Sequence, residues 1–273
     1  TYPQFGTATI TRPDGISIDL VTARSEFYVS PAAMPDVESG NIKHDLYRRD
    51  FTINTMAIAL DGTRYGRFYD YFGGQADLEE GIIRVLFNLS FVEDPTRILR
   101  AIRFEQRLGF QIEPETLGFL MNALQHDLLQ KVPAERIRTE LVQLLAEDRA
   151  PHVILRMHEL GVWQALLPGL QCSDVLIKHL HDARDYIDWF EKLQTGARLE
   201  RWLVYLLLLS GGVAAEELGN WPERLALSKR ERDMLLSFAA CREHLAAGLA
   251  QPIDNQHIYE LLEGQEIGRA SCR

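Results

Sequence analysis

Two acidic residues followed by regularly spaced arginines form the stretch best suited to chemistry. Glu93 and Asp94 stand just before Pro95, and arginine then recurs at helical spacing as Arg97, Arg100, Arg103 and Arg107. Asp94 and Arg97 are three residues apart, so a helix would carry them on one face. A carboxylate accepts hydrogen bonds and a guanidinium donates them. Together they could bind the Watson–Crick edge of cytosine or adenine, since each base presents an amino donor beside an acceptor.

The same residues also have a purely structural interpretation. Asp94 directly before a proline is a favourable N-cap, and the arginines could form a solvated face of the helix. On spacing alone the structural interpretation is the more common one. The pattern therefore predicts a helix, and leaves base recognition open.

The helix that must position these residues lies within residues 92–110. Ile98, Leu99 and Ile102 give it an apolar face. Pro95 suits the first turn, where its missing N–H costs nothing, and Gly109 is a good stop. Upstream of this helix the chain has the pattern of strands and turns, and downstream it has the pattern of successive helices. The sequence therefore predicts an α+β fold, with this helix as the joint.

The predicted strands contain one unexpected carboxylate. Residues 8–11 and 16–21 alternate like strands around a Pro-Asp-Gly turn. Asp19 lies in the middle of the second strand, opposite the larger aliphatic side chains. An acidic residue is disfavoured inside a strand, so Asp19 is either a metal ligand or a solvent-facing residue.

Residues 25–45 have little periodicity and contain Pro31, Pro35 and Gly40. They are predicted to form a long loop, which in a compact domain is often functional or mobile.

A pair of arginines follows that predicted loop. Arg48 and Arg49 beside Asp50 are candidates for binding phosphate, because arginine offers a fork of donors. The alternative is a surface ion-pair cluster. Asp50 is expected to cap a short helix from position 51. A strand at 56–60 and its return at 67–72 are expected to make a hairpin.

Helical patterns fill the rest of the chain, at residues 134–147, 151–160 and about 174–192, 198–209, 228–248 and 255–263. His181 and Asp182 form a pair of the kind found in metal-dependent phosphohydrolases, which need further His and Asp ligands. The other histidines fit no clear pattern, so a polar helix surface is the simpler interpretation. No Walker A loop, dinucleotide-binding glycine motif or serine-hydrolase motif is present.

Composition is that of an ordinary globular protein, with a formal net charge of −10 and a pI near 5.3. A local basic groove could still bind nucleic acid. Three distant cysteines indicate neither a disulfide framework nor a zinc site, and a reducing cytoplasm is the default. No apolar run has the length of a membrane span, so no membrane partner is expected.

Three motifs in a fixed order carry a family resemblance. RRDFTINTMA (48–57), YDYFGGQADL (69–78) and EDPTRILRAIRF (93–104) together resemble the bacterial tRNA nucleotidyltransferase and poly(A) polymerase family. Its members are the class II CCA-adding enzymes and their CC-, A- and poly(A)-adding relatives. The resemblance implies a template-independent enzyme that adds C or A to the tRNA 3′ end. Its substrates would be CTP and ATP, and its partner the tRNA acceptor end.

The resemblance also implies roles for individual residues. Asp19 would be the third carboxylate of a site for two Mg²⁺ ions, and residues 25–45 would be the mobile loop that helps to switch from CTP to ATP. Supporting residues on a later helix would be Arg136, Arg138 and Glu140. The implied nucleotide-binding residues are Arg48, Arg49, Asp50, Asn54, Glu93, Asp94, Arg97, Arg100 and Arg103.

The implied architecture is an incomplete nucleotidyltransferase palm, with a mixed or antiparallel sheet, at residues 1–88. A helical neck at 89–148 and a helical body at 149–265 would follow. Residues 266–273 have no periodicity and are expected to be non-native read-through.

One departure from the family's pattern bears on activity. The family's first motif, a GG-x-VRD turn with an Asp-x-Asp pair, is absent before residues 5–7, so we expect a fragment that is inactive by itself. A lesser departure is Thr55, where the family usually has alanine. A non-catalytic RNA-binding relative and a poly(A) polymerase remain as alternatives.

Overall fold

The computed structural model describes residues 6–193, 196, 199–213, 215–250 and 254–262. The chain divides into two compact units, and helix α4 (Thr96–Leu108) contributes to both. The first unit consists of Thr1–Ala101 and Leu108–Lys131, and the second of Ile102–Arg107 and Val132–Arg273. The expected read-through at 266–273 lies outside the described residues.

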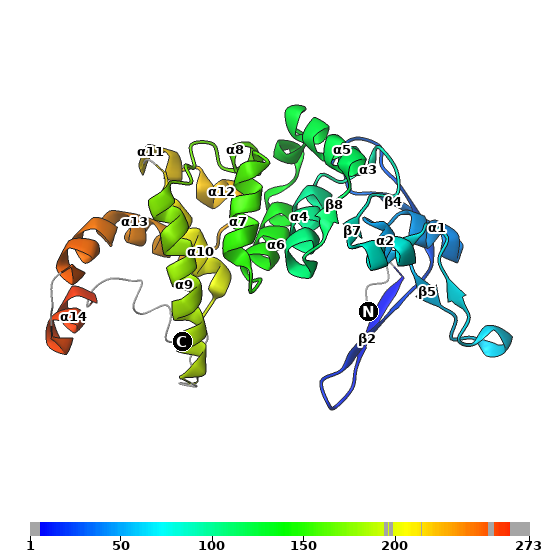
Figure 1. The fold of residues 1–273 in the computed structure, drawn as a ribbon, viewed down its shortest axis with the longest axis horizontal. Helices are drawn as coiled ribbons and strands as arrows, with labels where there is room; N and C mark the ends of the chain where they lie inside the picture. The colour runs from blue at the N-terminus through cyan, green and yellow to red at the C-terminus, as the bar shows by residue number, and fades with distance from the viewer. Residues whose placement is uncertain (1–5, 194–195, 197–198, 214, 251–253, 263–273) are drawn as a thin grey trace. The chain divides into compact units, whose positions relative to one another are not determined.

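The first unit combines short strand pairs with short helices (Figure 1). The antiparallel pairs are β1 (Thr7–Thr11) with β2 (Ser17–Val21), β3 (Arg24–Phe27) with β4 (Asp36–Ser39), and β5 (Ala57–Ile58) with β6 (Phe68–Tyr69). A parallel pair joins β7 (Ile82–Ile83) to β8 (Gln111–Ile112). The helices are α1 (Ile42–Tyr47), α2 (Gly74–Glu80), α3 (Ser90–Glu93), α5 (Pro114–Gln125) and the 3-10 turns η2 (Thr52–Asn54), η3 (Gly62–Arg64) and η4 (Leu128–Lys131). This mixture confirms the predicted α+β class.

Strands β1 and β2 form the hairpin predicted from the alternation and the Pro-Asp-Gly turn. Ile10 pairs with Ile18 and Ala8 with Leu20, while Asp19 lies opposite Thr9. Ile10, Ile18 and Leu20 are 53%, 51% and 53% exposed, so the aliphatic face of this hairpin stays half in water.

The prediction of a long loop over residues 25–45 was wrong. Strands β3 and β4 pair from Arg24 opposite Ser39 to Phe27 opposite Asp36, and helix α1 follows. Glu26 explains the error, because its side chain is only 7% exposed but is charged, and it is buried by ion pairs with Arg24 and Arg48. A strand held by ion pairs lacks the apolar alternation from which strands are predicted.

Helix α4 confirms the helix predicted in residues 92–110. Ile98 and Leu99 are fully buried, and Gly109 ends the helix with a φ of +70°. Asp94 Oδ1 accepts hydrogen bonds from the backbone N–H of Thr96 at 3.0 Å and from its hydroxyl at 2.6 Å. Asp94 therefore satisfies an N–H at the start of the helix, as the structural interpretation predicted.

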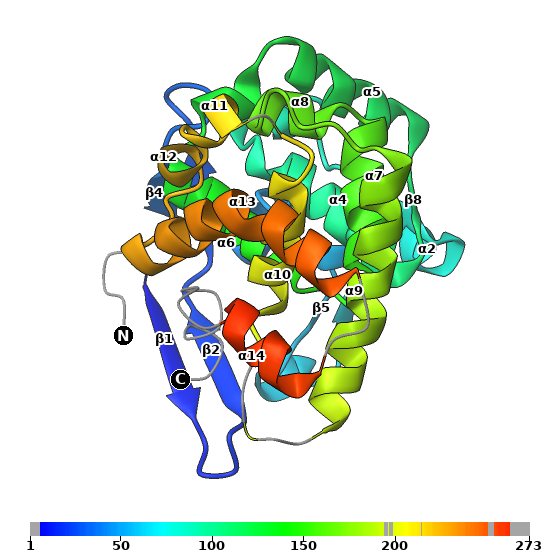
Figure 2. The same ribbon diagram turned by 90° about the vertical axis from the view of Figure 1, so that its left-hand side faces the viewer.

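The regular elements of the second unit, over its described residues, are all helices, which confirms the predicted series. Its helices are α6 (Ala134–Leu145), α7 (Ala150–Glu159), α8 (Val162–Leu166), α9 (Asp174–Lys192), α10 (Arg201–Ser210), α11 (Ala215–Leu218), α12 (Trp221–Arg224), α13 (Lys229–Leu249) and α14 (Asn255–Leu262). The apolar helix α10 packs against α6, α9 and α13 (Figure 2). No helix in the described parts of the chain is long and apolar enough to cross a membrane.

Candidate functional site

Arg97 is the most enclosed of the arginines predicted to bind nucleotide. It is only 4% exposed, and its guanidinium lies 5.8 Å from the ring centre of Phe87. It donates from Nη1 to the Ser90 hydroxyl at 2.7 Å and from Nη2 to the backbone carbonyl of Arg48 at 2.7 Å. These two bonds use two of the five N–H donors of arginine, so the guanidinium is held in a fixed orientation.

Glu93 and Asp94 lie beside Arg97 at the junction of α3 and α4, and both are half-buried. Burial raises the pKa of the Glu93 carboxyl, and the nearby charge of Arg97 offsets this only in part. The start of α4 therefore combines the acceptors of two carboxyl groups with the donors of a guanidinium. These groups are partly shielded from water, where a hydrogen bond is stronger and an unpaired polar group costs more free energy.

Asp50 ties the RRD segment (Arg48–Asp50) to the same helix. Its Oδ2 accepts from Arg100 Nε at 2.8 Å, and its Oδ1 accepts from the Phe51 N–H and from Asn54 Nδ2, both at 2.9 Å. The expected cap at Asp50 is therefore corrected: the 3-10 turn η2 starts from Phe51, and Asp50 braces it from one residue earlier. Asp50 is 7% exposed, so these hydrogen bonds replace the water that burial removes from its carboxylate.

The two arginines before Asp50 differ in exposure. Arg48 is 20% exposed and bridges Glu26 at 2.9 Å and Asp45 at 2.8 Å. Arg49 is 42% exposed and donates to the carbonyl of Asn54 and to Asp45. The structure thus makes Arg48 part of an ion-pair network, and leaves Arg49 the better placed of the two to meet a phosphate.

Sequence reasoning missed the residues that strand β3 adds to this region. Glu26 Oε1 accepts from Arg24 and Arg48, and Glu26 Oε2 accepts from the Tyr28 hydroxyl at 3.2 Å. Burial, together with the Glu26 carboxylate, raises the pKa of Tyr28 to about 12. The signal in the sequence was the pair of charged residues, Arg24 and Glu26, in this four-residue strand. Charged residues are also common in loops, so the pair did not distinguish a strand from a loop.

The remaining arginine-rich positions belong to the second unit. Arg103 of α4 is 8% exposed, and its guanidinium lies 3.8 Å from the carboxylate of Glu140 on α6. This ion pair joins the two helices. Arg138 instead pairs with Glu231 at 2.5 Å and lies over the ring of Trp202. Arg136 is half-buried on α6.

Asp19 is exposed on β2, where its Oδ1 accepts from the Thr9 hydroxyl at 2.6 Å. The described residues contain no group of three or more His, Cys, Asp or Glu side chains placed to hold a metal ion. Asp19 alone therefore does not constitute a metal site. The rings of His181 and His152 lie 5.6 Å apart, but no third potential ligand joins them within the described parts of the chain, so the phosphohydrolase alternative gains no support.

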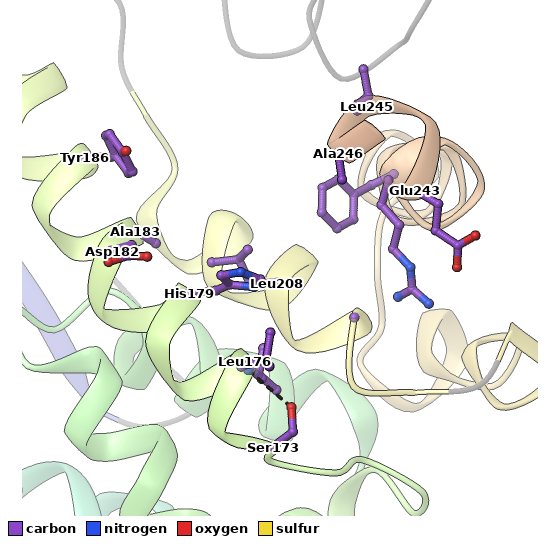
Figure 3. Close-up of a pocket in the computed structure, with 14 residues that line it drawn as sticks. Ser173, Leu176, His179, Asp182, Ala183, Tyr186, Leu208, Glu243, Leu245 and Ala246 are labelled. Carbon is purple, nitrogen blue, oxygen red and sulfur yellow. Dashed lines mark hydrogen bonds between the residues drawn. The ribbon is translucent and has the colours of Figure 1, made fainter. Parts of the chain in front are cut away.

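A separate pocket of about 640 Å³ lies in the second unit between α9 and α13 (Figure 3). Leu176, Ala183 and Tyr186 line it from α9, and Phe238 and Ala246 from α13. Its wall is mostly apolar, and neither Asp19 nor the residues predicted to bind nucleotide line it, although Asp182 does.

Family models match two parts of the chain. Residues 2–84 match the poly A polymerase head domain, and residues 109–173 match the "probable RNA and SrmB-binding site of polymerase A". The A-adding tRNA nucleotidyltransferase of Geobacter sulfurreducens is 43% identical over 86% of this chain, and that of Aquifex aeolicus is 34% identical over 96%. The chain spans only 27% and 32% of those two relatives. The CC-adding tRNA nucleotidyltransferase of Deinococcus radiodurans is 40% identical over 64% of this chain and 46% of its own.

The solved structures that resemble this chain are also tRNA-processing enzymes. An apo CCA-adding enzyme is 37% identical with a TM-score of 0.83, over 96% of this chain and 62% of its own. A tRNA-processing enzyme without ligand is 32% identical with a TM-score of 0.80, over 96% of this chain and 71% of its own. The Thermotoga maritima CCA-adding enzyme with bound tRNA is 34% identical with a TM-score of 0.77, over 97% of this chain and 61% of its own. Motifs, fold and relatives agree, and the chain belongs to the tRNA nucleotidyltransferase and poly(A) polymerase family.

Proposed function

We propose that this chain serves a template-independent RNA nucleotidyltransferase that adds A, or C and A, to the 3′ end of tRNA. The observation that carries the proposal is the arrangement at the start of α4. There the backbone N–H of the buried Arg97 donates to the carbonyl of Asp94 at 3.1 Å, and the Arg97 side chain is bonded to the backbone of the RRD segment. A base reader and a phosphate-binding segment are thereby joined in one unit.

The chemistry of the site fits this role. The carboxylate of Asp94 would accept from the exocyclic amino group of adenine or cytosine, and Arg97 would donate to the neighbouring ring nitrogen. Guanine and uracil present the opposite pattern, which would leave the buried groups unpaired. Arg49 would neutralise part of the triphosphate. Glu93, Arg100, Arg103, Arg136, Arg138 and Glu140 would orient these groups or support the helices that carry them.

Addition of A is the first choice within the family. The relatives that match 86% and 96% of the chain are A-adding enzymes, whereas the CC-adding relative matches 64%. CCA addition, poly(A) addition and RNA binding without catalysis are the alternatives. tRNA processing would place the protein in the cytoplasm.

A divalent metal, Mg²⁺ in our proposal, would lower the pKa of the RNA 3′-hydroxyl when bound. Asp19 would contribute one ligand to that metal. The full-length Asp19→Ala protein should therefore bind Mg²⁺ more weakly by calorimetry and lose turnover. Unchanged calorimetry and turnover would remove Asp19 from the site.

The test of function is incorporation of labelled nucleotide by the full-length protein. The substrates are tRNAs ending at the discriminator base, at C and at CC, each offered CTP and ATP separately. Addition of one A to the CC end alone supports the proposal in its A-adding form. Addition of C to the shorter ends supports the CCA-adding form. Binding of tRNA with no incorporation on any end contradicts the proposed enzyme.

The expected division into a head at 1–88, a neck at 89–148 and a body at 149–265 is retained as part of this proposal. It is supported by the match of the head-domain model to residues 2–84.

A further inference from the structure

Strand β3 reaches the proposed base-reading arginine through a chain of charged contacts. Glu26 Oε1 accepts from Arg48 Nη1 at 2.9 Å and from Arg24 Nη2 at 2.8 Å. Arg48 also donates to Asp45 at 2.8 Å, so its guanidinium is fixed between two carboxylates. The backbone carbonyl of the same Arg48 accepts from Arg97 Nη2 at 2.7 Å. One residue thus couples the hairpin to Arg97.

The charged side chains of this network are largely shielded from water. The side chains of Glu26 and Asp45 are 7% and 9% exposed, and Arg97 is 4% exposed. Charge-assisted hydrogen bonds shielded from water are stronger than exposed ones. Arg48 also lies at the C-terminal end of α1, where its N–H bonds to the carbonyl of His44. Its backbone is therefore held by both the helix and its own side chain.

The hairpin meets the start of α4 at a second point. The N–H of Ala32, in the connection between β3 and β4, donates to the carbonyl of Glu93 at 3.3 Å. The hairpin therefore contacts both Arg97, through Arg48, and the backbone next to Asp94. These are the two residues proposed to read the base.

We propose that Glu26 is a positioning residue for nucleotide selection. Glu26 fixes the side chain of Arg48, and the backbone carbonyl of Arg48 in turn sets the orientation of Arg97. The inference rests on the proposed function, because it assigns Glu26 to the same base-reading site. Glu26 has no contact with the nucleotide in this account. Its loss should change which base is accepted, while leaving the binding of RNA in place.

The experiment is a double-mutant cycle in the full-length protein with Glu26→Gln and Arg97→Ala. The readout is the ratio of kcat/KM for ATP to kcat/KM for GTP. Glu26→Gln should lower this ratio about tenfold, the effect of losing one charge-assisted contact. In the Arg97→Ala background the same substitution should have no further effect on the ratio, since its route to the base is already removed. The KM for tRNA should stay within about twofold of wild type in Glu26→Gln, as the proposal leaves RNA contacts untouched.

Glu38→Gln is the matched control, because Glu38 is exposed on β4 of the same hairpin. It should keep the wild-type ratio. If thermal unfolding shows that Glu26→Gln does not fold, Glu26→Asp replaces it, since it keeps the charge and shortens the side chain. The same loss of selectivity is expected from that variant.

Two results would overturn the inference. The first is a wild-type ratio in the folded Glu26 variant, with or without a change in the KM for tRNA. The second is an equal loss of selectivity in both backgrounds, which would mean that Glu26 acts by another route than Arg97. A wild-type protein that incorporates no nucleotide would instead refute the proposed function itself.

Discussion

At the scale of single residues, the structure combines the two interpretations of the acidic and basic residues near position 94. Asp94 bonds to Thr96 at the start of α4, as an N-cap would, and this contact fixes the orientation of its carboxylate. A structural bond and a recognition role are therefore compatible, because a carboxylate has more than one acceptor site.

Replacing Arg97 by alanine should reduce discrimination against GTP and UTP at least about tenfold, since the donors to the base edge are lost. Binding of tRNA should change little. Nucleotide competition and tRNA affinity would be measured on the same preparation. Arg107→Ala is the control on the same helix, because Arg107 is more than half exposed and pairs only loosely, at 3.8 Å, with Glu147. Wild-type discrimination in Arg97→Ala would reassign Arg97 to packing.

Asp45 should make the folded state sensitive to acid. Burial by itself would raise the pKa of Asp45, but hydrogen bonds from Arg48 and the charges of Arg48 and Arg49 outweigh it and lower the pKa. A carboxyl whose pKa is lower in the folded state stabilises it above the unfolded pKa, and this contribution is lost as the pH falls through the folded pKa.

The free energy of unfolding should therefore rise with pH across the acidic range, and Asp45→Asn should flatten that rise. Urea unfolding at several pH values between about 3 and 6 would measure it, a range set by the ordinary pKa of aspartate. An equal slope in both proteins would show that Asp45 does not contribute.

At the scale of elements, helix α2 is positioned by a glycine that the sequence marks only as a turn signal. A Cβ built on Gly74 would lie 2.3 Å from the carbonyl oxygen of Thr52, whereas a Cβ on Gly118 of α5 would meet nothing within 4 Å. A side chain at position 74 would therefore clash with η2, whereas a side chain at position 118 would have free space.

Gly74→Ala should destabilise the protein by about 1–3 kcal/mol, since α2 must move away from η2. Gly118→Ala should stabilise it by about 0.5–1 kcal/mol, because alanine is the better helix former. Denaturant unfolding of both variants would compare the signs. Two substitutions with the same sign would contradict the packing of α2 described here.

How much of these elements the sequence could predict depends on what holds each one. The β1–β2 hairpin and α4 follow from alternation, a Pro-Asp-Gly turn and an apolar stripe. Residues 25–45 could not be predicted as a hairpin, because the ion pairs that bury Glu26 include one with Arg48, 22 positions further along the chain. The proximity of Asp50 to Arg100 has the same origin, since no local pattern relates residues 50 positions apart.

At the scale of the whole molecule, the proposed binding of RNA must overcome the formal net charge of −10 that this chain carries. A protein of this charge can hold tRNA only through locally clustered basic groups. Its affinity should therefore fall about tenfold or more when salt is raised from roughly 50 to 200 mM, as counterions compete for the phosphates. Filter binding across this range would test it, with unfolding midpoints at each salt concentration as the control. A salt-independent affinity would mean that few phosphates are contacted.

The half-exposed aliphatic row on the β1–β2 hairpin has a practical consequence for handling the protein. Ile10, Ile18 and Leu20 present an apolar, aliphatic surface on a ribbon of two strands. Such a surface favours self-association at high concentration. Precipitation during concentration would begin here, and Ile18→Lys, which puts a charge in the centre of the row, is the first substitution for a more soluble preparation.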